Sequence, residues 1–85
     1  MGTRIAVIAI LVKAHSDSIP QINALLSEYS NFIVGRMGIP YHQKDVNIIS
    51  VAIDAPQDDI STLSGKLGRL QDVSVKTAYA PQETE

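Results

Sequence analysis

The sequence contains no cysteine. That absence excludes a disulfide scaffold, a thiolate zinc site, an iron–sulfur ligand set and a thiol nucleophile. Any bound metal would therefore need histidine or carboxylate ligands. Aromatic residues are also scarce, with no tryptophan, one phenylalanine and three tyrosines. None lies in residues 4–13 or 47–54, the two central strands predicted below, so the base-stacking platform of an RNA-recognition domain is missing.

The chain has neither a cluster of basic residues nor an apolar segment long enough to span a membrane. The formal net charge is −2, and no cluster of Lys and Arg provides the electrostatic footprint of a nucleic-acid-binding protein. The apolar run from Ile5 to Val12 is far shorter than the roughly 20 residues that span a bilayer, and no cleavage-like site follows it. We therefore predict a cytoplasmic protein that contacts neither nucleic acid nor membrane directly.

The length of 85 residues leaves room for one domain. We predict that this domain covers residues 1–80 and that residues 81–85 form a disordered tail. A chain of this size buries only about 60–65% of the surface that its unfolded form exposes. Association between copies is therefore a natural source of additional stability.

Two periodicities alternate along the chain and predict its fold. Stretches rich in Ile and Val with alternating apolar positions predict strands over residues 4–13, 32–37, 47–54 and 73–80. Apolar residues three and four apart predict one helix from Asp17 or Ser18 to about Tyr29, and a second that opens at Pro56. The resulting βαββαβ order predicts a ferredoxin-like α+β sandwich. Right-handed crossovers place both helices on one face of a four-stranded antiparallel sheet of order 4-1-3-2.

This arrangement leaves the other face of the sheet without a covering layer. Residues 4–13 are apolar at both odd and even positions, whereas residues 47–54 have one strongly apolar face and one smaller, more polar face. We assign the following residues to the open face and predict that a second copy of the chain covers it: Ala6, Ile8, Ile10, Val12, Ile48, Ser50 and Ala52.

Two histidines are candidate metal or ligand-binding residues. His15 and His42 both fall in predicted loops, and imidazole is the commonest metal-binding side chain. One interpretation is a site assembled from adjacent subunits, with a transition metal as the only cofactor that the sequence suggests. The other is a pair of exposed loop histidines, because no further ligand stands at a metal-site spacing.

The segment from Gly35 to Tyr41, GRMGIPY, is the most unusual in the chain. Its glycines permit close approach of another molecule, and its arginine can pair with a carboxylate or phosphate. The effector-binding candidates are Gly35, Arg36, Met37, Gly38 and Tyr41. The alternative is a bulged strand end with a solvated arginine. No Ser/His/Asp set or paired carboxylates can be identified, so we predict that the chain is not an enzyme.

Two segments carry a resemblance to a known family. The segments Ile33–Tyr41, IVGRMGIPY, and Ser64–Leu70, SGKLGRL, closely resemble a small bacterial family, the “putative iron-only hydrogenase system regulator” proteins, and the similarity runs from Arg4 to Tyr79. It implies an ACT-like domain similar to the C-terminal domain of nickel-responsive regulators, without a DNA-binding arm. Such domains bind small effectors between subunits. Many that bind amino acids have a glycine in the first strand–helix loop, and Ala14–Ser18 has none.

Three functions are compatible with these features. The first is a stand-alone regulatory module, a dimer or tetramer that binds a small effector and influences hydrogenase expression or maturation through a protein partner. The second is a metal-binding protein that uses His15 and His42. The third is a structural adaptor without a ligand.

Overall fold

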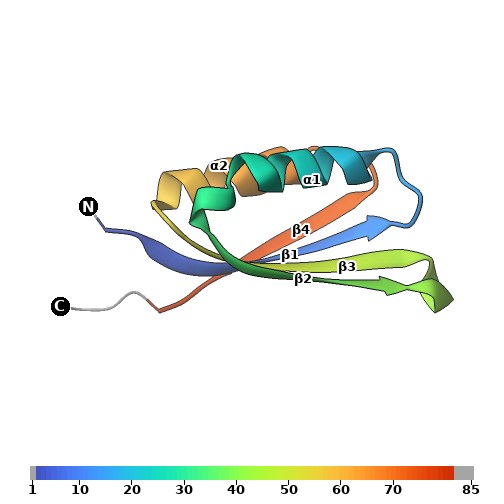
Figure 1. The fold of residues 1–85 in the computed structure, drawn as a ribbon, viewed down its shortest axis with the longest axis horizontal. Helices are drawn as coiled ribbons and strands as arrows, with labels where there is room; N and C mark the ends of the chain where they lie inside the picture. Colours follow the sequence, from blue (N-terminus) through green and yellow to red (C-terminus); the bar gives the residue numbers. More distant parts are fainter. Residues whose placement is uncertain (1, 82–85) are drawn as a thin grey trace.

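The computed structural model describes residues 2–81, so the predicted tail lies, apart from Pro81, outside the described residues. Figure 1 shows two layers, a sheet and the helices that cover one of its faces. The strands are β1 Arg4–Lys13, β2 Ile33–Tyr41, β3 Val46–Ala55 and β4 Val73–Tyr79, and the helices are α1 Ser18–Glu28 and α2 Gln57–Gly68. Short 3₁₀ turns at Ser30–Phe32 and His42–Lys44 flank β2.

The sheet has the topology that the sequence predicts. Its order is β2-β3-β1-β4, and each neighbouring pair is antiparallel. The ferredoxin-like α+β fold is therefore confirmed. Because β1 and β3 are central neighbours that run in opposite directions, the loop that follows β1 and the turn that precedes β3 lie at the same end of the sheet.

The hydrophobic core lies between the helices and the sheet. Both helices bury one apolar stripe, Ile22 and Leu26 from α1 and Ile60, Leu63 and Leu67 from α2. The sheet contributes alternate residues of its central strands, namely Ala6, Ile8, Ile10, Val12, Ile49, Val51, Ile53 and Ala55. Each fully buried Val, Ile or Leu side chain of this core stabilises the fold by about 1.5–3 kcal/mol relative to an exposed one.

The predicted open-face assignment is wrong for β1. Ala6, Ile8, Ile10 and Val12 are buried beneath the helices, and the odd-numbered residues Ile5, Val7, Ala9 and Leu11 lie on the open face. A strand that is apolar on both faces gives the same pattern in either orientation, and a shift of one residue exchanges the faces. Packing decides the orientation, since the centre of the core needs Ile8 and Ile10 where the opposite face offers only Ala9. The placement of Ile48, Ser50 and Ala52 on the open face is correct.

β2 is longer than the predicted strand, which ended at Met37. It continues through Gly38 and Pro40 to Tyr41. Proline is tolerated here because β2 is an edge strand and pairs only with β3, so the missing N–H removes no bond to a second neighbour. A bulge between Ile33 and Gly35 shifts the register at the start of the strand.

Candidate functional site

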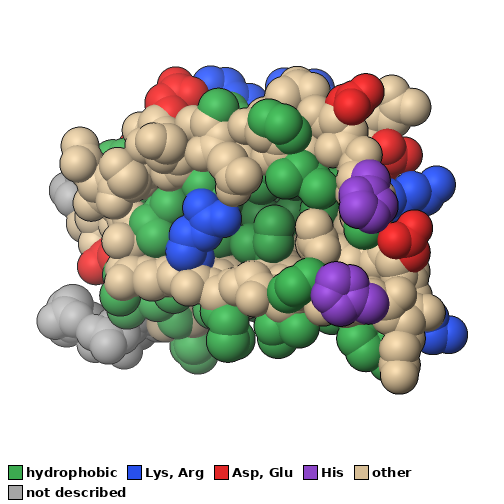
Figure 2. Space-filling view, turned by 45° about the vertical axis from the view of Figure 1, so that its right-hand side comes forward, with side chains coloured by type: hydrophobic (Ala, Val, Ile, Leu, Met, Phe, Trp, Pro, Cys, Tyr) green, Lys and Arg blue, Asp and Glu red, His purple; other side chains and the backbone are tan. Residues whose placement is uncertain are grey.

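A cavity of about 260 Å³ opens at the end of the sheet where the β1–α1 loop meets the β2–β3 turn. Both candidate histidines, His15 and His42, line it. The remaining lining residues come from the same two loops and their flanking elements: Ala14, Ile19, Tyr41, Asp45, Val46 and Asn47. Figure 2 shows the two histidines on one side of the molecule, with acidic side chains beside them.

The backbone of the two loops holds these side chains in place. His15 and Asp45 both take the left-handed conformation, with φ of 67° and 59°. Histidine and aspartate are among the residues that adopt it most readily. The N–H of Ala14 donates to the carbonyl oxygen of Asp45 at 2.9 Å, and the N–H of Asp45 donates to the carbonyl oxygen of His42 at 3.3 Å. These bonds tie the loop that carries His15 to the turn that carries His42.

A second group of hydrogen bonds fixes the far side of the β1–α1 loop. The Ser16 hydroxyl accepts from the N–H of Ser18 and donates to Oδ2 of Asp72, each at 3.0 Å. The hydroxyl of Ser18, which is 3% exposed, donates to the carbonyl oxygen of Gln71 at 2.6 Å. The loop is therefore anchored to the α2–β4 connection as well. Asp17 is the N-cap residue but makes no side-chain capping bond.

The cavity combines an apolar wall with groups that can form hydrogen bonds. Ala14, Ile19 and Val46 provide the apolar wall. The polar groups that line the cavity are two imidazoles, the carboxylate of Asp45 and the amide of Asn47. The Tyr41 hydroxyl is already engaged, since it donates to Oε1 of Gln43 at 2.9 Å. Ligand pockets start at about 300 Å³, so the cavity suits a compact polar molecule or an ion. Within residues 2–81 no three His, Asp or Glu side chains converge to hold a metal ion.

Asp45, Val46 and Asn47 belong to the cavity but were not candidates from the sequence. A signal for them existed, because the predicted sheet order already brings the residues before the third strand beside the loop after the first. That order also brings His15 and His42 together within one chain. Assembly of the pair from two subunits, as first expected, is not needed.

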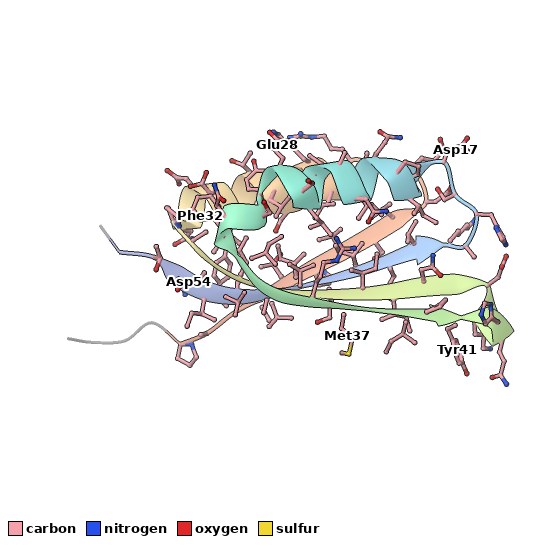
Figure 3. All side chains as sticks on the ribbon, in the orientation of Figure 1. Asp17, Glu28, Phe32, Met37, Tyr41 and Asp54 are labelled. Atoms are coloured by element: carbon pink, nitrogen blue, oxygen red, sulfur yellow. The ribbon has the colours of Figure 1, made fainter. Side chains whose placement is uncertain are left out.

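The residues of the GRMGIPY segment do not converge on one site. Strand alternation sends Arg36 and Gly38 to the helix side and Gly35, Met37 and Tyr41 to the open face. In Figure 3 the side chains of Met37 and Tyr41 point away from the helices. Of the five candidates, only Tyr41 lines the cavity described above.

Arg36 links the exposed edge strand to the helical layer. Its guanidinium donates to Oδ1 of Asn23 on α1 at 3.1 Å, at an exposed position. The alternative interpretation leaves Arg36 solvated. Its guanidinium is exposed but is also hydrogen-bonded to α1.

The glycines of β2 have no steric role within one chain. Neither Gly35 nor Gly38 has a positive φ, and a Cβ built at either position meets no atom within 4 Å. Glycine inside a strand costs about 0.5–1 kcal/mol relative to alanine and often marks close approach of a ligand or another backbone. The structure leaves open space at both positions.

The open face of the sheet carries seven of the eight large hydrophobic side chains that are exposed among the described residues. Its large exposed side chains are Ile5, Val7, Leu11, Met37, Ile39, Tyr41 and Ile48. Contiguous apolar surface on this scale marks an interaction site. None of the described helices is long and apolar enough to cross a membrane.

Comparison with known proteins agrees with the resemblance found in the sequence. Residues 4–77 match the family described as “TM1266-like: Iron-only hydrogenase system regulator, putative”. The structure of the uncharacterized protein TM1266 from Thermotoga maritima superposes with a TM-score of 0.87 at 34% sequence identity, over 91% of this chain and 96% of that chain. No curated protein matches the sequence.

Proposed function

Since this chain belongs to the TM1266-like family, described as putative iron-only hydrogenase system regulators, we propose that it is a non-enzymatic regulatory module that binds a small effector. The module acts as a homo-oligomer and transmits the bound state to a protein partner in hydrogenase expression or maturation. Its site is the cavity between His15 and His42.

The arrangement of this cavity is the observation that carries the proposal. Two loops from different parts of the chain meet there, are bonded to each other through Ala14 and Asp45, and present polar groups beside an apolar wall. An amphipathic metabolite with one charged end, such as an amino acid, matches that combination. Ligand binding that tightens this junction would alter the end of the sheet, where a partner could detect it.

A thermal-shift screen against amino acids and nucleotides tests effector binding. A ligand present at 100 times its dissociation constant stabilises the folded state by about 2.7 kcal/mol. For a domain of this size, each kcal/mol raises Tm by about 4–8 °C. Failure of every compound in a broad metabolite panel would favour the ligand-free adaptor.

The site is tested by variants that remove one cavity side chain at a time. We expect His15→Gly and His42→Ala each to weaken the binding of a ligand found in the screen, as measured by isothermal titration calorimetry. His15→Gly is informative because glycine retains the left-handed conformation of residue 15. The control is Gln21→Ala on α1, which does not line the cavity. Equal affinity in all four proteins would place the effector elsewhere.

The shared position of the histidines favours a second candidate, transition-metal binding. Two imidazoles supply part of a ligand set for nickel, zinc or iron, with water or a second copy supplying the rest. Titration with each metal, followed by native mass spectrometry, tests it. Unchanged binding in the His15→Gly, His42→Ala double variant removes this candidate without affecting the metabolite screen.

A further inference from the structure

The strand register arranges the bulky and the small side chains of the open face in separate rows that cross the strands. Residues that lie opposite one another on the four strands form transverse rows. One row is bulky at three of its four places, with Ile39, Ile48, Leu11 and Ser74 in the order β2, β3, β1, β4. The row four residues away along the strands has small side chains at three of its four places: Gly35, Ala52, Val7 and Ala78. Between them runs a row of Met37, Ser50, Ala9 and Lys76.

From this arrangement of rows we infer that a second copy of the chain covers the open face. The two copies are related by a two-fold axis that crosses the strands along the Met37–Ser50–Ala9 row. This inference rests on the self-association included in the proposed function and gives it a specific geometry. The axis places the bulky row of each copy over the small row of the other. Ile48 then lies over Ala52 of the second copy, and Ile39 lies over its Gly35.

The charges at the two ends of the face favour the same axis. Lys13 of β1 pairs with Val46 of β3 at one end, and Ile5 of β1 pairs with Asp54 of β3 at the other. A two-fold axis across the strands brings opposite ends together, so the lysine of each copy approaches the aspartate of the other. These contacts lie at the rim of the interface, where opposite charges chiefly determine orientation.

An axis parallel to the strands fits the same surface poorly. It would place the β1 and β3 residues of one row against each other, so that Leu11 would meet Ile48 while the small rows left a gap. Lys13 and Asp54 would remain at opposite ends. The crossing axis has one unfavourable feature, because Lys76 faces its own counterpart. Lys76 lies on the edge strand β4 and is exposed, so its long stem lets the ammonium group reach solvent.

The area of the face is adequate for a stable dimer. β1 and β3 have ten residues each, β2 has nine and β4 has seven. For all four strands, dimensions of about 3.4 Å per residue and 4.8 Å between strands give a footprint of roughly 600 Å². The accessible surface of such a corrugated face exceeds its footprint and approaches the about 800 Å² that each partner buries in a standard interface.

This geometry gives Gly35 a role and connects the interface to the cavity. The absence of a side chain at Gly35 leaves room for Ile39 of the second copy. Tyr41 and Val46 line the cavity and also form the row that faces the Ile5 and Asp54 end of the second copy. In the proposed dimer the partner thus completes the rim of the cavity.

Thiol crosslinking tests the axis directly, because the sequence has no cysteine of its own. Residues on the axis face their own counterparts, so Ser50→Cys should be crosslinked to itself by a bifunctional thiol reagent that spans sheets about 10 Å apart. Ile48→Cys and Ala52→Cys should each fail alone, since a residue one row from the axis lies about 14 Å along the strand from its counterpart. A refolded mixture of these two variants should crosslink.

Other crosslinking patterns overturn the inference. Self-crosslinking of Ile48→Cys would demonstrate the axis parallel to the strands, because that axis keeps each central-strand residue within one strand spacing, about 4.8 Å across the sheet, of its counterpart. The absence of all crosslinks in folded protein, or self-crosslinking of Ile48→Cys, would exclude face-to-face pairing about the proposed axis.

Sedimentation equilibrium provides a second measurement that does not depend on thiols. We expect wild-type dimers and, for Leu11→Asp, a dissociation constant raised by roughly 30-fold or more, as for a central interface residue. The exposed α2 variant Ser61→Asp should behave like wild type. A wild-type monomer at micromolar concentration overturns the inference even if the metabolite screen succeeds. Normal dimers with no ligand would instead remove the effector proposal and leave the interface intact.

Discussion

Single side chains on β1 have different environments although their chemistry is the same. Ile8 is fully buried beneath the helices, while Ile5, on the same strand, is 57% exposed on the open face. Truncating a buried isoleucine removes its transfer free energy and leaves a cavity, whereas truncating an exposed one removes contacts only in the assembled state.

We therefore predict that Ile8→Ala lowers the free energy of unfolding by about 2–4 kcal/mol. Ile5→Ala, its matched control, should lower it by less than about 1 kcal/mol. Urea titrations followed by circular dichroism, at the lowest practical protein concentration, give both values. Similar losses for the two variants would contradict the orientation of β1.

At His15 the effect of the side chain on stability can be distinguished from the effect of the backbone conformation. A left-handed conformation costs a residue with a side chain roughly 1–2 kcal/mol, and the φ of 67° at His15 lies in that region. We predict that His15→Gly is about 1 kcal/mol more stable than His15→Ala. Thermal unfolding of the two variants measures this difference. A more stable alanine variant would show that the loop does not hold residue 15 in this conformation.

At the level of whole elements, β2 is the strand least explained by its own chain. It pairs only with β3, neither helix buries it, and its two glycines have open space beside them. Its side chains alternate between the open face and the helix side, so the same substitution at two positions probes two different surfaces.

We predict that Gly35→Val weakens the dimer by roughly 30-fold or more, since the added side chain occupies the space for Ile39 of the second copy. Gly38→Val changes the same strand on the helix side and should leave dimerisation unchanged. Sedimentation equilibrium compares the two variants, and circular dichroism verifies that both are folded. Equal dimerisation of both variants would mean that the interface does not include the Gly35 row.

For the whole molecule, the arrangement of charge favours one orientation of the two copies in the proposed dimer. Lys13 and Asp54 lie at opposite ends of the open face within one chain, and the proposed axis makes them neighbours between chains. Exposed ion pairs contribute at most about 1 kcal/mol each, but the two-fold symmetry gives two such pairs in the proposed dimer. Reversing one charge in each chain replaces attraction with repulsion at both.

We predict that Lys13→Glu and Asp54→Lys each raise the dissociation constant of the dimer and that the double variant restores it toward the wild-type value. Lys44→Glu, in the β2–β3 turn, is the control for a change in net charge. The measurement is sedimentation equilibrium at low salt, where screening is weak. No recovery in the double variant would indicate that these two residues are not neighbours in the dimer.

The sequence by itself determined the order of the elements, the sheet topology and the family, because apolar periodicity, turn residues and the handedness of crossovers act locally along the chain. It did not determine which face of β1 is buried, since Ile5–Val12 is apolar at odd and even positions alike. Only packing beneath α1 and α2 decided that Ile8 and Ile10 enter the core. The cavity that His15 and His42 share likewise depends on contacts between loops distant in the sequence, such as the bond from Ala14 to Asp45.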